Sequence, residues 1–122
     1  MGFMKKLLYC FVLINIISSN SCKKTDDIAK NTPDCIREEI KRLTSPTSSS
    51  WAIGSVDEYI FQGIIVYAFE PSKNIADAST IIKDANCNMV CSVGGFGGPN
   101  VLLCNGDKFY EKAVLQRNIW KE

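Results

Sequence analysis

Apolar and polar residues follow different periods in different parts of the chain, and the first clear pattern is helical. Within residues 32–46, TPDCIREEIKRLTSP, three apolar residues recur with helical spacing and form one face: Ile36, Ile40 and Leu43. Thr32 can cap this helix, and Pro33 suits its first position. Glu38 can pair with Arg42 on the polar face. The pattern predicts an amphipathic helix that stops before the second proline of the segment.

Residues 56–71, VDEYIFQGIIVYAFEP, are rich in β-branched and aromatic side chains and are interrupted only by Gln62-Gly63. This pattern predicts a β-hairpin. A two-residue turn would place two pairs on one face, Phe61 with Ile64 and Tyr59 with Val66. Three residues would line the other face: Ile65, Tyr67 and Phe69. Because one helix covers only one of these apolar faces, the C-terminal segment covers the other, or that face stays open as a binding patch.

A second hairpin and a C-terminal element complete the pattern. One predicted strand contains Ile81 and Ile82, the next spans residues 89–93, and residues 84–86 turn between them. In the last part of the chain, the sequence pattern predicts a short helix over 108–116 and a final strand that includes Trp120. The expected fold is a small α+β domain, an antiparallel sheet of four to five strands with the N-terminal helix packed on one face.

The N-terminal residues have the order of a secretory signal peptide. Two lysines precede an apolar run over residues 7–17, and small or polar residues follow at 18–21. The run is too short to span a bilayer as a mature helix. The segment SNSC, which ends at Cys22, resembles a bacterial lipobox, although Ser19 stands where leucine is usual. The alternatives are an ordinary signal peptide with an unrelated cysteine nearby, or a signal anchor that is retained.

These patterns divide the chain into three expected parts: a lipoprotein signal peptide (1–21), a flexible tether after the lipidated cysteine (22–33) and a single domain (34–122). Two or more acyl chains on Cys22 would hold the protein stably at a membrane. Lys24 and the acidic residues after it resemble a surface-export signal of Bacteroidota lipoproteins; a solvated spacer is the alternative. We therefore expect an outer-membrane location, on either the surface or the periplasmic side.

The composition of the chain argues against several classes of function. Removal of residues 1–21 leaves 12 basic and 13 acidic residues, a net charge of −1. A nearly neutral domain without a basic stripe argues against nucleic acid as a partner. The chain has no histidine, the commonest general base, and no G-x-S-x-G segment. We therefore expect neither an enzyme nor a bound cofactor.

Six cysteines are present. Cys10 belongs to the expected signal peptide and Cys22 to the lipid anchor, which leaves four in the domain: Cys35, Cys87, Cys91 and Cys104. An even number in a small exported domain predicts disulfide bonds. Three pairings are possible, and we favour Cys91–Cys104 with Cys35–Cys87. A four-cysteine zinc site is the rival, but the C-x3-C spacing and the export compartment favour disulfides.

Two segments are candidates for ligand contact. The glycine-rich loop over residues 94–100, GGFGGPN, lacks the following helix and the lysine-serine pair of a phosphate-binding loop. Phe96 at its tip is either a core residue or a ligand contact, and Tyr67 is a second candidate contact on the sheet. Residues 84–88, DANCN, match the start of a calcium loop but lack its glycine and its final glutamate.

Several of these motifs together resemble a known family. They are Cys35-Ile36 at the helix start, the hairpin EYIFQGIIVYAFEP, the segment DANCNMVCSVGGFGG with Cys104, and the terminal IWKE. The combination is similar to an uncharacterised family of short Bacteroidota lipoproteins and exported domains, over residues 34–122. The segment NVLLC departs from that family, in which Gly-Asp-Gly often precedes the last cysteine. The family has no established activity, so the resemblance implies location and fold only.

Two functions follow from these observations. The first is a non-enzymatic, membrane-anchored envelope lipoprotein that binds a protein, a peptide or a glycan, with Phe96 and Tyr67 as candidate contacts. The second is an inhibitor-like or envelope-assembly module that acts on a partner protein.

Overall fold

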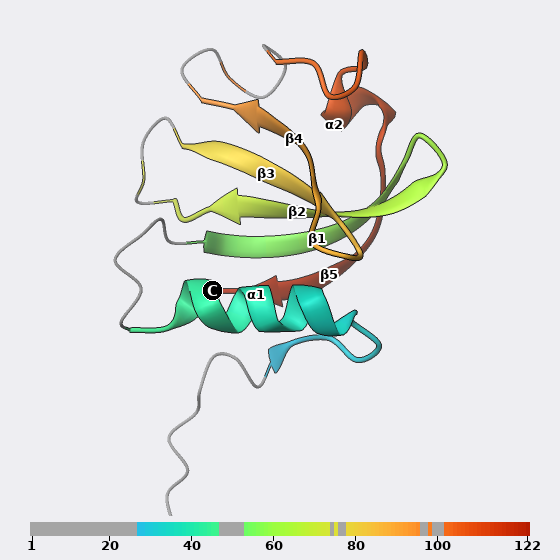
Figure 1. Ribbon diagram of the computed structural model, residues 1–122. Coiled ribbons are helices and arrows are strands. Elements are labelled where there is room, and N and C mark those ends of the chain that lie inside the picture. The colour runs from blue at the N-terminus through green and yellow to red at the C-terminus, as the bar shows by residue number, and fades with distance from the viewer. Residues whose placement is uncertain (1–26, 47–52, 74, 76–77, 96–97, 99–101) are drawn as a thin grey trace, which may run out of the picture.

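The computed structural model describes residues 27–46, 53–73, 75, 78–95, 98 and 102–122. Cys22 and Phe96 therefore lie outside the described residues. The elements are α1 (Asp34–Thr44), β1 (Ile53–Phe61), β2 (Ile64–Pro71), β3 (Ser79–Asp84), β4 (Met89–Gly94), α2 (Phe109–Lys112) and β5 (Val114–Lys121). The strands form one five-stranded antiparallel sheet in the order β4-β3-β2-β1-β5 (Figure 1). The predicted α+β class is confirmed.

The β1–β2 hairpin turns at Gln62 and Gly63, as predicted. Both residues have positive φ, 50° and 80°, which a two-residue turn of type I′ requires. The register pairs Phe61 with Ile64 and Tyr59 with Val66. Because successive side chains of a strand point to opposite faces, this register gives the sheet its two apolar faces.

Helix α1 covers one face of the sheet. Its three apolar residues, at helical spacing, are at most 9 % exposed: Ile36, Ile40 and Leu43. They belong to a helix-side core, whose buried sheet residues are Ile53, Val56, Tyr67, Phe69, Ile119 and Trp120. The predicted helix is therefore confirmed together with its packing face.

Two local details of the helix prediction are wrong. The Thr32 hydroxyl donates to the carbonyl oxygen of Ala29 at 2.6 Å and does not cap α1, whose N-cap position is occupied by Pro33. Arg42 pairs with Glu39 at 2.7 Å rather than with the neighbouring Glu38. Glu39 also lies 2.6 Å from the ammonium group of Lys83 in β3. Glu39 therefore binds one cation from its own helix and one from the sheet.

The inner end of the predicted tether is part of the domain. Ile28 is 8 % exposed in the helix-side core. The backbone N–H of Ala29 donates to the carbonyl oxygen of Ile119 at 2.8 Å, and Arg117 donates to the carbonyl oxygen of Lys30 at 2.6 Å. Residues 29–31 thus lie along the outer edge of β5, on the N-terminal side of the boundary expected at residue 34.

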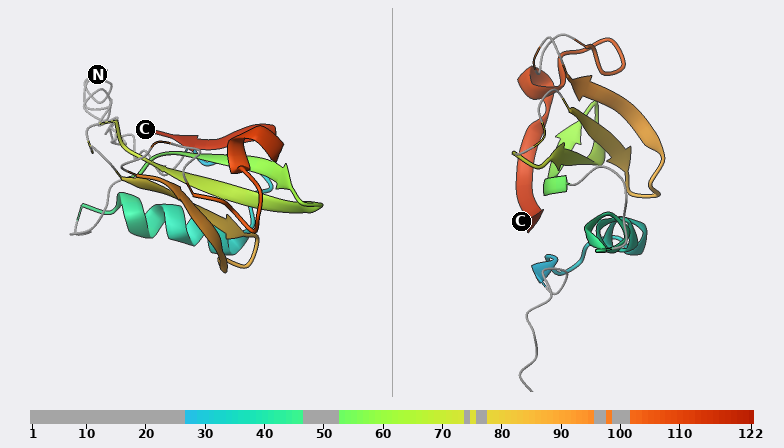
Figure 2. Two further views of the ribbon diagram at one scale, coloured as in Figure 1. Left: turned by 90° about the horizontal axis from the view of Figure 1, so that it is seen from above. Right: turned by 90° about the vertical axis from the view of Figure 1, so that its left-hand side faces the viewer.

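The C-terminal segment covers the opposite face, as one of the two alternatives predicted. Its α2-side core contains Phe61, Val66, Ala68, Ile82, Val93, Cys104 and Phe109. Figure 2 shows α1 and α2 on opposite sides of the sheet. Phe109 is fully buried, with its ring centroid 5.1 Å from that of Phe61. Helix α2 is shorter than the predicted helix over 108–116, because β5 begins at Val114 and pairs with β1.

Both favoured disulfide bonds are confirmed. Cys35–Cys87 joins the first turn of α1 to the turn between β3 and β4. Cys91–Cys104 joins β4 to the segment that leads to α2. Since all four sulfur atoms form disulfide bonds, none is available for the alternative four-cysteine zinc site. Each bond therefore ties one covering segment to the sheet.

Candidate functional site

Tyr67, the candidate contact residue on the sheet, lies in the helix-side core. Its side chain is 3 % exposed, and its hydroxyl donates to Glu58 Oε2 at 3.0 Å. Burial, followed by the hydrogen bond to Glu58, raises the pKa of Tyr67 to about 12. Tyr67 faces α1 rather than solvent, so its assignment as a ligand contact is corrected to a core role.

Residues 84–88, which resemble the start of a calcium loop, form a turn that is held by hydrogen bonds to a side chain of the same segment. Asp84 Oδ1 accepts hydrogen bonds from the backbone N–H groups of Asn86 and Asn88, each at 2.9 Å. This arrangement explains the alternation of Asp and Asn, which commonly bond to backbone groups in turns. In the part of the chain that the structure describes, no three His, Cys, Asp or Glu residues are grouped as metal ligands.

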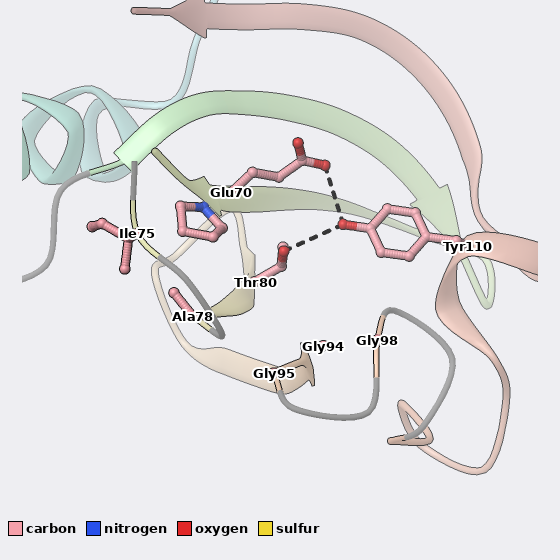
Figure 3. Close-up of a pocket in the computed structure, with 9 residues that line it drawn as sticks. Glu70, Ile75, Ala78, Thr80, Gly94, Gly95, Gly98 and Tyr110 are labelled. Atoms are coloured by element: carbon pink, nitrogen blue, oxygen red, sulfur yellow. Dashed lines mark hydrogen bonds between the residues drawn. The ribbon is translucent and has the colours of Figure 1, made fainter. Parts of the chain in front are cut away.

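A pocket of about 360 Å³ lies on the face of the sheet opposite α1, beside the glycine-rich loop. Nine described residues from four parts of the chain line it: Glu70, Pro71, Ile75, Ala78, Thr80, Gly94, Gly95, Gly98 and Tyr110 (Figure 3). We call this cavity the glycine-loop pocket. The sequence identified the loop, but the polar residues of the opposite wall lie far from it in the chain.

Three polar side chains meet in the glycine-loop pocket. The hydroxyl of Tyr110 donates to Glu70 Oε1 at 3.1 Å and lies 3.4 Å from Thr80 Oγ1 (Figure 3). The second carboxylate oxygen, Glu70 Oε2, accepts from the hydroxyl of Ser55 at 3.3 Å. Residues from β1, β2, β3 and α2 are thus linked by hydrogen bonds, and Thr80 is 8 % exposed. This network fixes the orientation of the Glu70 carboxylate.

The two tyrosines next to Glu70 are held in the neutral form. Burial raises the pKa of Tyr110, and the negative charge of Glu70 raises it further. Burial also raises the pKa of Tyr59 to about 12, and the charges of Glu70 and Asp57 add to this effect. The Tyr59 and Tyr110 rings are in edge contact, with centroids 6.4 Å apart. A neutral phenol is a hydrogen-bonding group but a poor general base. The two phenols are therefore hydrogen-bonding groups at neutral pH.

Glycine forms the opposite wall of the glycine-loop pocket. Gly94, Gly95 and Gly98 have φ of 90°, 90° and 87°, a region that other residues rarely adopt. The N–H of Gly98 donates to the carbonyl oxygen of Gly95 at 3.1 Å, which forms a turn beside the pocket. The three described glycines present backbone without side chains to the pocket.

The described residues contain no helix with the length and apolar character needed to cross a membrane. No curated protein and no solved structure matches the chain. One protein-family model, described as "Domain of unknown function (DUF6970)", matches residues 42–122. The matched segment contains all five strands, α2 and every lining residue of the glycine-loop pocket. The expected membership of a family without a known activity is confirmed: the chain belongs to the DUF6970 family.

Proposed function

We propose that this protein is a non-enzymatic lipoprotein of the bacterial outer membrane and that its domain binds a glycan in the glycine-loop pocket. The observation that carries the proposal is the oriented group of Glu70, Thr80 and Tyr110 in a cavity of about 360 Å³. Ligand pockets of this size commonly combine a few fixed polar groups with nonpolar walls.

A sugar suits this set of groups better than a peptide side chain or an apolar ligand does. Vicinal sugar hydroxyls can donate to a carboxylate, which has several acceptor sites on its two oxygens. The Tyr110 and Thr80 hydroxyls can accept or donate toward the same ligand. The glycine wall of the pocket adds backbone groups at close approach. Hydrogen bonds to a charged group contribute about 1.5–3 kcal/mol each, so Glu70 would supply much of the affinity.

Binding of immobilised polysaccharides to the mature chain tests this proposal. Glu70→Gln and Tyr110→Phe should each weaken binding of the retained polysaccharide by about tenfold, equivalent to about 1.4 kcal/mol. Glu38→Gln is the matched control, because Glu38 is 71 % exposed on α1, on the far side of the sheet. Equal binding by all three variants and the wild type would exclude the glycine-loop pocket as the site.

The proposed membrane anchor rests on the sequence SNSC before the lysines at 23 and 24. Five residues lie between Cys22 and Ile28, the first buried residue among those described, so six residue steps separate the two. A fully extended chain of that length reaches about 20 Å, so the domain would stay close to the membrane. Intact mass of the protein from a membrane fraction should correspond to a chain that starts at Cys22 and carries acyl groups. A mass that includes residues 1–21 or lacks acyl groups would contradict the anchor.

A second candidate is an envelope-assembly or inhibitor-like module that contacts a partner protein. It is favoured by five exposed apolar residues near the β1–β2 turn, with exposed fractions between 41 % and 60 %: Ile60, Ile64, Ile65, Val114 and Leu115. Ile60 pairs with both Ile65 and Val114, so these three form a row across three strands. An exposed apolar cluster is typical of a protein-contact surface.

Crosslinking in whole cells tests this second candidate. Loss of a reproducible crosslinked protein in Ile60→Ser and Ile65→Ser would support it. Met89→Ser is the control, because Met89 is 63 % exposed elsewhere on the sheet. A crosslinked protein that persists in all three variants would exclude the row of Ile60, Ile65 and Val114 as the contact surface.

A further inference from the structure

A second cavity adjoins the glycine-loop pocket. Its volume is about 350 Å³, and it is lined by Gly54, Ser55, Glu70, Pro71, Lys73, Lys121 and Glu122. We call it the lysine pocket. The two cavities share Glu70 and Pro71 at the end of β2.

Both cavities lie on the same face of the sheet. Ser55 in β1 is paired with Glu70 in β2 and with Lys121 in β5, and directly paired residues in an antiparallel sheet project to the same side. Glu70 and Ala68 are two residues apart in β2 and therefore also share a face. Ala68 belongs to the α2-side core. The lysine pocket therefore continues the glycine-loop pocket along the side opposite α1.

The carboxylate of Glu70 is shared between the two cavities. Its Oε1 atom accepts from Tyr110, which lines the glycine-loop pocket. Its Oε2 atom accepts from Ser55, which lines the lysine pocket. One side chain thus presents an acceptor oxygen to each cavity. An elongated ligand that occupied both cavities would pass over this carboxylate.

The lysine pocket differs from its neighbour in charge. Lys73 and Lys121 both line it, and among the described residues neither forms an ion pair within 4 Å. Glu70 and Glu122 are the acidic lining residues of this pocket, and Glu122 Oε1 accepts from the hydroxyl of Ser72 at 3.4 Å. The glycine-loop pocket has no basic residue among its described lining residues. Two ammonium groups that have no ion-pair partner in the described part of the chain are therefore available to a negatively charged ligand group.

We propose that the two cavities form one groove for an acidic oligosaccharide of at least two sugars. A neutral part of the ligand would bond to Glu70 and Tyr110, and the carboxylate of a uronic acid unit would lie between Lys73 and Lys121. This inference rests on the proposed glycan-binding function and specifies the ligand class of the same site.

Calorimetric titration of the mature chain with two probes tests the inference. The probes are digalacturonic acid and the neutral digalactose with the same linkage. The wild type should bind the acidic probe about 5–10-fold more tightly at low salt, because each partly exposed ion pair contributes at most about 1 kcal/mol. This preference should shrink as salt is added, since exposed charges are screened.

Two double variants separate the effect of the lysine pocket from that of general charge. Lys73→Gln with Lys121→Gln should remove the preference for the acidic probe and leave binding of the neutral probe unchanged. Lys41→Gln with Lys112→Gln makes the same charge change outside both cavities and should keep the preference. If the wild type binds both probes equally, or the first double variant keeps its preference, the inference is wrong and glycan binding stands. If neither probe binds the wild type, the inference is wrong, and the polysaccharide-binding test then decides the proposed function separately.

Discussion

Replacement of Cys35 and Cys87 by alanine should lower the free energy of unfolding of the mature chain by about 4 kcal/mol. The bond closes a loop with a sequence separation of 52 residues, and loop-closure entropy for that length corresponds to about 4 kcal/mol. Cys35 is exposed and Cys87 is half-buried. Little packing is therefore lost with the sulfur atoms, and the effect arises mainly in the unfolded state.

The other disulfide bond provides an internal comparison. Cys91–Cys104 has a sequence separation of 13 residues, for which the same relation gives about 3 kcal/mol. Cys104 is fully buried in the α2-side core. Its replacement by alanine also leaves a small cavity, which adds about 1 kcal/mol. The two double variants should therefore lose similar amounts of stability for different reasons.

Equilibrium unfolding in urea, followed by circular dichroism, measures both changes. The denaturant slope should increase in each variant, because an unfolded chain without the crosslink exposes more surface. With a total stability of about 5–15 kcal/mol expected for a domain, a loss of about 4 kcal/mol leaves about 1–11 kcal/mol, so the variants are marginally folded if the wild type lies at the lower end of this range. During mild reduction, the exposed Cys35–Cys87 bond should open first, which mass spectrometry after alkylation can detect.

A loss of less than about 1 kcal/mol in Cys35→Ala with Cys87→Ala, with native circular dichroism and an unchanged slope, would refute the chain-entropy argument. It would mean that noncovalent contacts, those of the apolar face of α1 and the Glu39–Lys83 ion pair, are enough to hold α1 on the sheet.

Three further changes have defined outcomes. The hydrogen bond from Arg42 and the ion pair with Lys83 outweigh burial and hold the pKa of Glu39 at about 2, below its usual 4.5. This stabilisation is present above pH 4.5 and is lost as the pH falls toward 2. Urea unfolding should show wild type more stable than Glu39→Gln by about 1–2 kcal/mol at pH 7, with the difference shrinking in acid; a pH-independent difference would contradict the ion pair. In alkaline ultraviolet titration, the folded domain should ionise its tyrosines above the usual pKa of 10, whereas the urea-unfolded chain should titrate near 10; the residues concerned are Tyr59, Tyr67 and Tyr110. Their raised pKa values stabilise the fold below pH 10, and this contribution is lost as the pH rises toward 12. Coincident folded and unfolded titrations would be inconsistent with their burial. Gly94→Ala should lower stability by about 1 kcal/mol, because alanine is strained at a φ of 90°; an unchanged urea midpoint would argue against strain at this residue.

Short-range patterns determined much of the fold. The Gln62-Gly63 turn and the alternation around it predicted the register of β1 and β2, because a two-residue turn allows few pairings. The helical spacing of apolar residues predicted α1 and its buried face for the same local reason. The even number of cysteines predicted disulfide bonds, and the favoured pairing proved correct, although three pairings were compatible with the sequence.

Long-range contacts overrode local preference in several places. Glu39 binds both Arg42 of its own helix and Lys83 of β3, whereas Glu38 pairs with Lys41. The predicted helix over 108–116 shortens to α2 because β1 offers backbone partners from Val114 onward. The end of the predicted tether packs against the sheet, because the carbonyl oxygen of Ile119, far away in sequence, accepts a hydrogen bond from the backbone of Ala29.

The candidate site depends on tertiary structure most of all. The glycine-rich loop was visible in the sequence, but Glu70, Thr80 and Tyr110 carry no shared local pattern, and 40 residues separate the first from the last. Tyr67 and Glu70 belong to the same strand but lie in different surroundings. Tyr67 is buried under α1, whereas Glu70 lines a polar cavity. The alternation of β2 assigns them to opposite faces, but only the packing of α1 and of the C-terminal segment decides what covers each face. A local pattern specifies how a strand pairs, whereas a pocket forms where segments distant in sequence leave a gap between them.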